Sequence, residues 1–255
     1  MTQILKLEGL MVRFGGLTAV NGVSLTIASG EIRGLIGPNG AGKTTLFNAI
    51  SGLAPASAGS VHLDGLEITS KSAPQRAALG IRRTFQTVQL VQSFTVYENL
   101  LFGLHTRAGN PLTRLIVGSY ATPDADADAI IDEVLDYLGM RDLKHRVVDT
   151  LTIAHQRYVE IGRALVARPK LLMLDEPTAG LSPAQIERLD DLIGRLSSDW
   201  KVSILLVEHV IPLVVKLCSR ITVLDRGRVI AEGTGAEIGQ DAAVQKAYLG
   251  ERLDA

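Results

Sequence analysis

Cysteine is almost absent from this sequence of 255 residues. The single cysteine, Cys218, has no partner for a disulfide within the chain, which is typical of proteins that fold in a reducing cytoplasm. Cys218 lies in an apolar stretch, so a packed thiol is favoured over a reactive nucleophile. The sequence therefore gives no support to a small secreted domain held together by disulfides.

Long apolar runs are also missing. A membrane-spanning helix needs about 18 or more consecutive apolar residues, and the best stretch, residues 204–217, is interrupted by charged residues and a proline. The first ten residues contain Lys6 and Glu8 and do not resemble a signal peptide. We therefore expect neither a membrane span nor a secretory leader.

An excess of charge of either sign is missing as well. Lysine and arginine together number 26 and aspartate and glutamate 27, so the formal net charge is −1. Proteins that bind nucleic acids usually carry a basic surplus, so we expect no nucleic-acid partner. The length suits one large α/β domain, with room for a helical insertion.

The most informative stretch of the chain is rich in glycine. Residues 37–45 read Gly-Pro-Asn-Gly-Ala-Gly-Lys-Thr-Thr and match G-x-x-x-x-G-K-[ST], the pattern of a phosphate-binding P-loop. Residues 31–36 predict a strand and residues 46–50 a helix, the context that such a loop requires. Glycines allow successive N–H groups to turn inward around phosphate oxygens, and the helix N-terminus adds partial positive charge.

The P-loop pattern assigns chemistry to individual residues. We expect Lys43 to reach the β- and γ-phosphates of a nucleotide and the Thr44 hydroxyl to ligate Mg²⁺. The nucleotide-binding residues predicted in this loop are Gly37, Pro38, Asn39, Gly40, Ala41, Gly42, Lys43, Thr44 and Thr45.

Two later apolar stretches are each followed by a polar pair. Residues 171–174 are wholly apolar, as in a central parallel strand covered on both faces, and Asp175-Glu176 follows them. Residues 203–207 repeat the pattern before Glu208-His209. Ligands bind at the carboxyl ends of strands in open α/β sheets, so we expect these side chains at one edge of the sheet. The alternative for the acidic pair is an N-cap of the next helix.

The sequence alone leaves the roles of three other features open. Phe14, ahead of the P-loop, can stack on an adenine ring, although a packed core ring is the more frequent fate of a phenylalanine. Gln86 can hydrogen-bond water on Mg²⁺, although an exposed loop amide is the default. The aspartates spaced along residues 124–132 lack the glycine and closing glutamate of a calcium loop, which favours a solvated helix face.

From about residue 96 to residue 148 the pattern becomes helical. Thr122-Pro123-Asp124 predicts a helix start, apolar residues at helical spacing follow it, and Gly139 predicts its end. Another helix is expected to open at residues 151–157 and to end before Pro169.

The remaining patterns favour β-structure. Residues 4–7, 23–27 and 61–63 predict short strands, and residues 221–231 predict a closing hairpin around a polar turn. Strands mixed with helices in this way predict an α/β fold.

Together, these motifs resemble the nucleotide-binding subunit of ATP-binding cassette (ABC) transporters over essentially the whole chain. The resemblance implies a P-loop NTPase core with a mostly parallel central sheet, an antiparallel β subdomain and a helical subdomain insertion. It implies a single domain of residues 1–255, with the helical subdomain at about 96–168 and the signature within it. It also implies an ATPase that uses ATP and Mg²⁺.

Particular residues match the family's functional positions. The P-loop matches the Walker A motif, Asp175 ends the Walker B strand, Glu176 matches the catalytic carboxylate and His209 the switch histidine, while Phe14 matches the adenine-stacking aromatic. The resemblance implies Glu176, His209, Lys43 and Gln86 as catalytic residues and Thr44, Gln86 and Asp175 as Mg²⁺ ligands.

Three short sequences resemble one branch of this family, the ATPases of importers for branched-chain (hydrophobic) amino acids. They are Arg-Thr-Phe-Gln at 83–86, Glu-Pro-Thr-Ala-Gly-Leu at 176–181 and Ala-Tyr-Leu-Gly at 247–250. The branch implies an ATP-hydrolysing subunit of a bacterial importer for such amino acids or related small solutes, lying peripherally on the cytoplasmic face of the inner membrane. Its implied partners are two permease subunits, a second homologous ATPase or another copy of itself, and indirectly a periplasmic binding protein.

Other functions fit this sequence less well. A soluble ABC ATPase of DNA repair or chromosome organisation is the main alternative, but the long coiled-coil insertions and basic surfaces of such proteins are missing. A non-hydrolysing regulator is disfavoured by Glu176, and a P-loop GTPase by the lack of an Asn-Lys-x-Asp element.

The signature departs from the family pattern Leu-Ser-x-Gly-Gln. Residues 151–155 read Leu-Thr-Ile-Ala-His, and Ser182 stands where the D-loop aspartate is usual. Thr152 keeps the hydroxyl, His155 replaces an amide and Ala154 adds a methyl. We expect all three to meet a nucleotide, and the methyl of Ala154 can crowd the phosphate or tilt the N–H of this residue. If the partner ATPase has the usual signature, we expect the two ATP sites of the dimer to be unequal.

Overall fold

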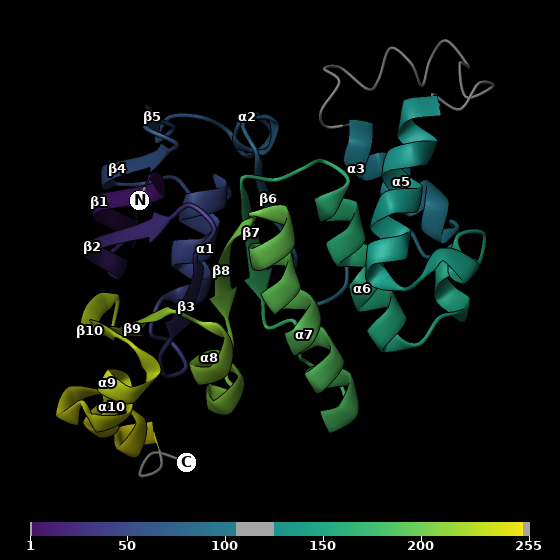
Figure 1. The fold of residues 1–255 in the computed structure, drawn as a ribbon. Coiled ribbons are helices and arrows are strands. Elements are labelled where there is room, and N and C mark those ends of the chain that lie inside the picture. The colour runs from purple at the N-terminus through teal and green to yellow at the C-terminus, as the bar shows by residue number, and fades with distance from the viewer. Residues whose placement is uncertain (1, 106–124, 252–255) are drawn as a thin grey trace.

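Two sheets organise the computed structural model, which describes residues 2–105 and 125–251 (Figure 1). An antiparallel sheet has the strand order β2-β1-β4-β5. Its strands are β1 (Gln3–Phe14), β2 (Leu17–Ala28), β4 (Ala58–Leu63) and β5 (Leu66–Glu67). The central sheet has the order β10-β9-β3-β8-β7-β6 and is parallel except for the pair β9 and β10. Its strands are β3 (Ile32–Ile36), β6 (Ile81–Arg83), β7 (Leu171–Asp175), β8 (Ser203–Val207), β9 (Arg220–Asp225) and β10 (Arg228–Gly233).

The middle of the central sheet is covered on both faces. Every residue of β3, β7 and β8 is buried, which confirms the prediction from the two apolar runs. A strand with no exposed face can be apolar at every position, whereas a half-exposed strand alternates. The predicted hairpin near residues 221–231 is also confirmed, because β9 and β10 pair antiparallel across it. The α/β fold class is therefore confirmed.

Helices cover these sheets and extend the molecule at one end. They are α1 (Lys43–Ser51), α2 (Ala73–Ala78), α3 (Val96–His105), α5 (Ala125–Leu138), α6 (Ile153–Leu165), α7 (Pro183–Trp200), α8 (Ile211–Leu217), α9 (Gly235–Gln240) and α10 (Ala242–Glu251). Two short 3₁₀ turns, η1 (Arg141–Leu143) and η2 (Val148–Thr150), lie between α5 and α6. Helices α3, α5 and α6 gather on the side away from β1 and β2 (Figure 1). Within the described part of the chain, no helix has the length and apolar character needed to cross a membrane.

The helical end shares one hydrophobic core with the central sheet. Buried Leu100, Val134 and Val159 belong to the same cluster as Leu174 of β7. Helix α5 ends at Leu138, and Gly139 follows with a left-handed φ of 66°, as predicted for a glycine stop. The predicted helix start at Thr122-Pro123-Asp124 lies outside the described residues.

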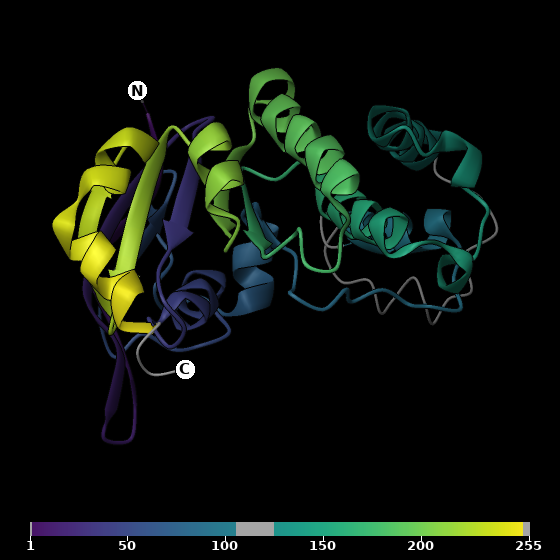
Figure 2. The same ribbon diagram turned by 90° about the horizontal axis from the view of Figure 1, so that it is seen from below.

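The first hairpin is longer than the sequence predicted. Strands β1 and β2 continue to the pair Phe14 and Leu17, and their hairpin projects from the body of the molecule (Figure 2). Gly9 and the shifts of register within β1 hide the alternation that predicts a strand. Phe14 is 53% exposed near the tip, so the interpretation of this residue as a packed core ring is wrong.

Helix α7 does not begin at the acidic pair Asp175-Glu176, so the alternative in which this pair is the N-cap of the next helix is wrong. Its N-cap is Ser182, whose N–H donates to Oε1 of Gln185 at 2.8 Å in a capping box. Asp175 and Glu176 are therefore not the cap of this helix. Ser182 stands where the D-loop aspartate is usual, and serine, like aspartate, is a residue type that caps helices well.

Candidate functional site

The P-loop runs from the end of β3 to the start of α1, as its flanking sequence predicted. A Cβ atom at Gly37, which has a φ of 151°, would lie 2.1 Å from a carbonyl oxygen of β9. A Cβ atom at Gly42, with a φ of 101°, would lie 2.5 Å from the carbonyl oxygen of Ala19. Both positions therefore require glycine. The loop is also tied to the turn between β9 and β10, because the N–H of Gly227 donates to the Ala41 carbonyl at 2.9 Å.

Lys43 is buried at the first position of α1. Its Nζ donates to the carbonyls of Gly37 at 2.6 Å and Pro38 at 3.0 Å. These bonds fold the ammonium group back over the loop, so its positive charge and the N-terminal end of α1 lie together. Anions are stabilised at such a place.

A cavity of about 470 Å³ opens over the P-loop, a size within the range of small-molecule sites. It is lined by Leu17, Thr18, Ala19, Asn39, Gly40, Ala41, Gly42, Lys43, Thr44, Thr45, Glu176, His209 and Arg226. The sequence predicted the P-loop, Glu176 and His209 but missed the residues from β2 and Arg226. These come from a strand and a turn whose closeness to the loop depends on packing. Phe14 is absent from the lining, where Leu17 of the same hairpin is present and 65% exposed.

Glu176 is held between two other predicted site residues. Its Oε1 lies 2.8 Å from Nε2 of His209, and its Oε2 accepts a hydrogen bond of 2.8 Å from Nε2 of Gln86. The N–H of Glu176 donates to the Val207 carbonyl at 2.9 Å, and its φ of 47° is unusual for a residue other than glycine. Such strained conformations cluster at functional sites. The end of β7, the end of β8 and the segment after β6 thus meet at one carboxylate.

Glu208, the other half of the Glu-His pair, has a different position. It is buried, and its carboxylate accepts hydrogen bonds from the N–H of Thr178 at 2.9 Å and of His209 at 3.1 Å. These bonds link the turn after β7 to the end of β8. Glu208 therefore helps to fix the backbone just after β7 and β8, where Glu176 and His209 lie.

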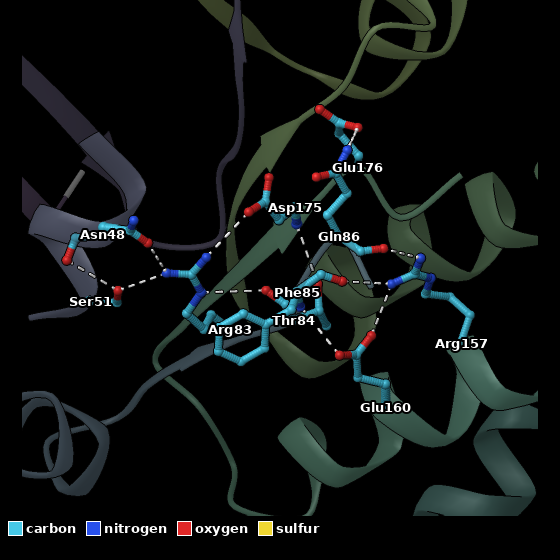
Figure 3. Close-up of polar contacts among 10 residues, drawn as sticks. All are labelled: Asn48, Ser51, Arg83, Thr84, Phe85, Gln86, Arg157, Glu160, Asp175 and Glu176. Atoms are coloured by element: carbon cyan, nitrogen blue, oxygen red, sulfur yellow. Dashed lines mark hydrogen bonds and ion pairs between the residues drawn. The ribbon is translucent and has the colours of Figure 1, made fainter. Parts of the chain in front are cut away.

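Asp175 lies deeper than Glu176 and pairs with Arg83, the first residue of the 83–86 motif, to which the sequence assigned no role of its own. Arg83 donates from one guanidinium nitrogen to Oδ2 of Asp175 at 3.2 Å and from another to Oδ1 of Asn48 at 2.7 Å and Oγ of Ser51 at 3.0 Å (Figure 3). Burial raises the pKa of the Asp175 carboxyl above its ordinary value, and the nearby Arg83 opposes that rise. Arg83 thus joins β7 to the helix that follows the P-loop.

The three residues predicted to hold Mg²⁺ offer suitable donor atoms. Thr44 is exposed and lines the cavity, Asp175 is buried at the end of β7, and Gln86 lies against Glu176. Hydroxyl, carboxylate and amide oxygens are the ligands that Mg²⁺ prefers. The donor set therefore fits the ion.

The signature lies at the start of α6. Thr152 is the N-cap, and its Oγ1 accepts a hydrogen bond from the N–H of His155 at 3.3 Å. Ala154 is only 6% exposed, so the chain itself covers its methyl, whereas Ile153 is 57% exposed. Little of the methyl is therefore accessible in this chain, and the expectation that it crowds a nucleotide stays a prediction.

A buried ion pair follows on the same helix and was also missed. Nη1 of Arg157 lies 3.0 Å from Oε2 of Glu160, and the side chains are 2% and 1% exposed. Burial raises the pKa of the Glu160 carboxyl, with Arg157 opposing the rise. The spacing of three residues on a helix permits such a pair, but nothing local indicates that it is buried.

Comparison with known proteins gives consistent results. Residues 20–179 match the profile of the family described as ABC transporter, and residues 228–254 match that described as branched-chain amino acid ATP-binding cassette transporter. The chain is 40% identical over 253 residues to the high-affinity branched-chain amino acid transport ATP-binding protein BraF of Pseudomonas aeruginosa and to LivG of Escherichia coli. Each comparison covers 97% of this chain and 98% of the relative.

Solved structures show the same likeness. The chain superposes on an ATP-binding cassette of an ABC transporter in its ADP conformation with a TM-score of 0.87 and 32% identity, covering 98% of this chain and 100% of the other. A nucleotide-free ATP-binding cassette gives a TM-score of 0.86 and 32% identity over 96% of this chain and 98% of the other.

Proposed function

The chain belongs to the ABC transporter family, and from that premise we propose that it is the ATP-binding, ATP-hydrolysing subunit of an importer for branched-chain amino acids or related hydrophobic solutes. The match of residues 228–254 to the branched-chain family supports the choice of substrate class. The proposal of ATP hydrolysis rests on the position of Glu176, which lines the P-loop cavity and is oriented by Gln86 and His209.

The proposed chemistry is in-line attack of water on the γ-phosphate. Lys43 and the P-loop N–H groups stabilise the negative charge that spreads over the phosphate oxygens. Glu176 acts as general base toward the water. His209 and Gln86 fix the direction of its carboxylate, and that carboxylate keeps further lone pairs for a water proton. Thr44, Asp175 and Gln86 would hold a Mg²⁺ ion, which would supply additional positive charge at the phosphates.

The proposed partners follow from the same premise. Two permease subunits carry the solute, a second homologous ATPase or another copy of this chain completes the dimer, and a periplasmic binding protein delivers the substrate. Thr152, the backbone at Ala154 and His155 are presented to the nucleotide of the second ATPase. The subunit lies peripherally on the cytoplasmic face of the membrane. A soluble ABC ATPase unrelated to transport is disfavoured, since relatives of nearly full length are named as transport proteins.

The test uses the transporter assembled in proteoliposomes with its permeases and binding protein. Glu176→Gln should keep ATP affinity and lower the ATPase rate about 100-fold or more, since it removes the general base. Glu187→Gln, at an exposed position on α7, is the matched control and should behave as wild type. Uptake of labelled leucine, with labelled ribose as comparison, tests the substrate class. Normal hydrolysis by Glu176→Gln, or uptake of ribose but not leucine, would contradict the corresponding part of the proposal.

A further inference from the structure

The buried ion pair Arg157–Glu160 on α6 hydrogen-bonds to the backbone of the segment that carries Gln86. Arg157 donates from Nη1 to the carbonyl of Phe85 at 2.8 Å and from Nη2 to the carbonyl of Gln86 at 2.9 Å. Glu160 accepts through Oε1 from the N–H groups of Phe85 at 3.2 Å and Gln89 at 3.4 Å. All four bonds reach backbone atoms, so the pair fixes the path of the segment whatever its side chains are.

The contacts continue from this segment to the site. The Gln86 backbone is held by Arg157, and its side-chain amide donates to Glu176. Figure 3 shows the resulting row, with Arg157 on one side of Gln86 and Glu176 on the other. The start of the segment is held separately, because Arg83 binds Asp175 and residues of α1. Helix α6 is thus connected to the carboxylate through one side chain.

The charges of the pair are not explained by stability alone. Two buried charges must be desolvated, and a well-packed apolar pair of similar volume is often as stable. What an apolar pair cannot do is bind four backbone groups of the neighbouring segment. Burial raises the pKa of the Glu160 carboxyl because it disfavours the ionised form. Arg157 and the N–H groups of Phe85 and Gln89 oppose this rise.

We propose that Arg157 and Glu160 are positioning residues: they fix the backbone of the segment that carries Gln86 and thereby hold the Gln86 amide against the Glu176 carboxylate. The inference rests on the proposed function, because it concerns the orientation of a general base. Arg157 and Glu160 lie one to two turns from the start of α6. The contacts between the first two turns of α6 and Glu176 therefore pass through the backbone and side chain of Gln86.

The main test is the double substitution Arg157→Met with Glu160→Leu in the assembled transporter. It removes both charges together and leaves neither one buried alone. We expect kcat for ATP hydrolysis to fall about 10- to 100-fold, because small misplacements of catalytic groups cost that much, while ATP affinity changes little. The matched control is Arg33→Met with Glu31→Leu, another buried arginine paired with glutamate, at the far end of β3 from the P-loop. It should keep kcat.

A second comparison separates positioning from a merely structural role. In a Gln86→Ala background the α6 substitutions should cause little further loss of kcat, since the pair acts through Gln86. Equal losses with and without Gln86 would overturn the proposal. Arg157→Lys guards against misfolding, because it keeps the charge but lacks the fork that reaches two carbonyls and a carboxylate. Wild-type kcat in Arg157→Lys would also overturn the proposal.

Amide hydrogen exchange tests the same proposal without a measurement of catalysis. Amide hydrogen exchange at Phe85 and Gln89 should become faster in the α6 double variant and remain unchanged in the β3 control, because the Glu160 acceptor is lost. Unchanged exchange at both amides would contradict the inference. If wild-type transporter hydrolyses no ATP, the proposed function fails. If it does and the α6 variant matches it, only the present inference fails.

Discussion

Arg83 and Asp175 form a buried ion pair, with 3.2 Å between the guanidinium and the carboxylate and side-chain exposures of 9% and 8%. The same guanidinium binds Asn48 and Ser51 of α1 and lies 4.5 Å from the ring centre of Phe85. One side chain therefore holds together the strand that carries the acidic pair, the helix behind the P-loop and the segment that leads to Gln86.

Arg83→Met should lower the free energy of unfolding by about 3–5 kcal/mol, because it leaves Asp175 buried without its partner. Urea denaturation followed by circular dichroism measures this change. Arg141→Met, which removes ion pairs of an exposed arginine with Asp132 and Asp136, is the control and should cost about 1 kcal/mol or less. The double variant Arg83→Met with Asp175→Asn should recover part of the loss. Equal losses of unfolding free energy at Arg83 and Arg141 would contradict the prediction, because burial would then not increase the contribution of the Arg83–Asp175 pair to stability.

Lys43→Met should weaken ATP binding about 10- to 100-fold, since a hydrogen bond to a charged group contributes about 1.5–3 kcal/mol. A fluorescent ATP analogue titrated at equilibrium measures the affinity. Lys246→Met removes an exposed lysine from α10 and should leave the affinity unchanged. Equal affinities of the Lys43 variant and wild type would argue against nucleotide binding at this loop.

Ala154→Gly should give no gain in ATPase rate in the assembled transporter, because the methyl is covered by the chain itself. The substitution should instead lower the free energy of unfolding by about 0.5–1 kcal/mol, since glycine is unfavourable in a helix. Steady-state hydrolysis and urea denaturation measure the two effects. A several-fold rise in rate would restore the view that this residue weakens a nucleotide site.

Cys218 should resist thiol reagents until the protein unfolds. Burial raises the pKa of its thiol from an ordinary value of 9.0 to about 12. Because the folded-state pKa is the higher one, this group's contribution to stability is complete below pH 9 and is lost as the pH rises toward 12. Ellman's reagent at pH 8 should therefore label wild type at the rate of unfolding and label it at once in urea. Rapid labelling of the native protein would contradict this.

The sequence by itself determined the parts of this protein that depend on neighbouring residues. The P-loop has a fixed spacing of glycines, lysine and threonine, and most of β7 and β8 consists of the apolar runs 171–174 and 204–207, so local pattern was enough to predict them. The α/β class and the family resemblance followed from the order of such motifs. The single-domain boundaries and the individual roles of the site residues stay predictions.

Only the tertiary structure decided how these parts meet. Gln86 and His209 reach Glu176 across 90 and 33 residues of sequence, and the Arg157–Glu160 pair acts on a loop more than 70 residues away. The covered methyl of Ala154 depends on how α6 packs. Local periodicity carries no information about such contacts, because they form only when the strands order themselves in the sheet and the helices close over it.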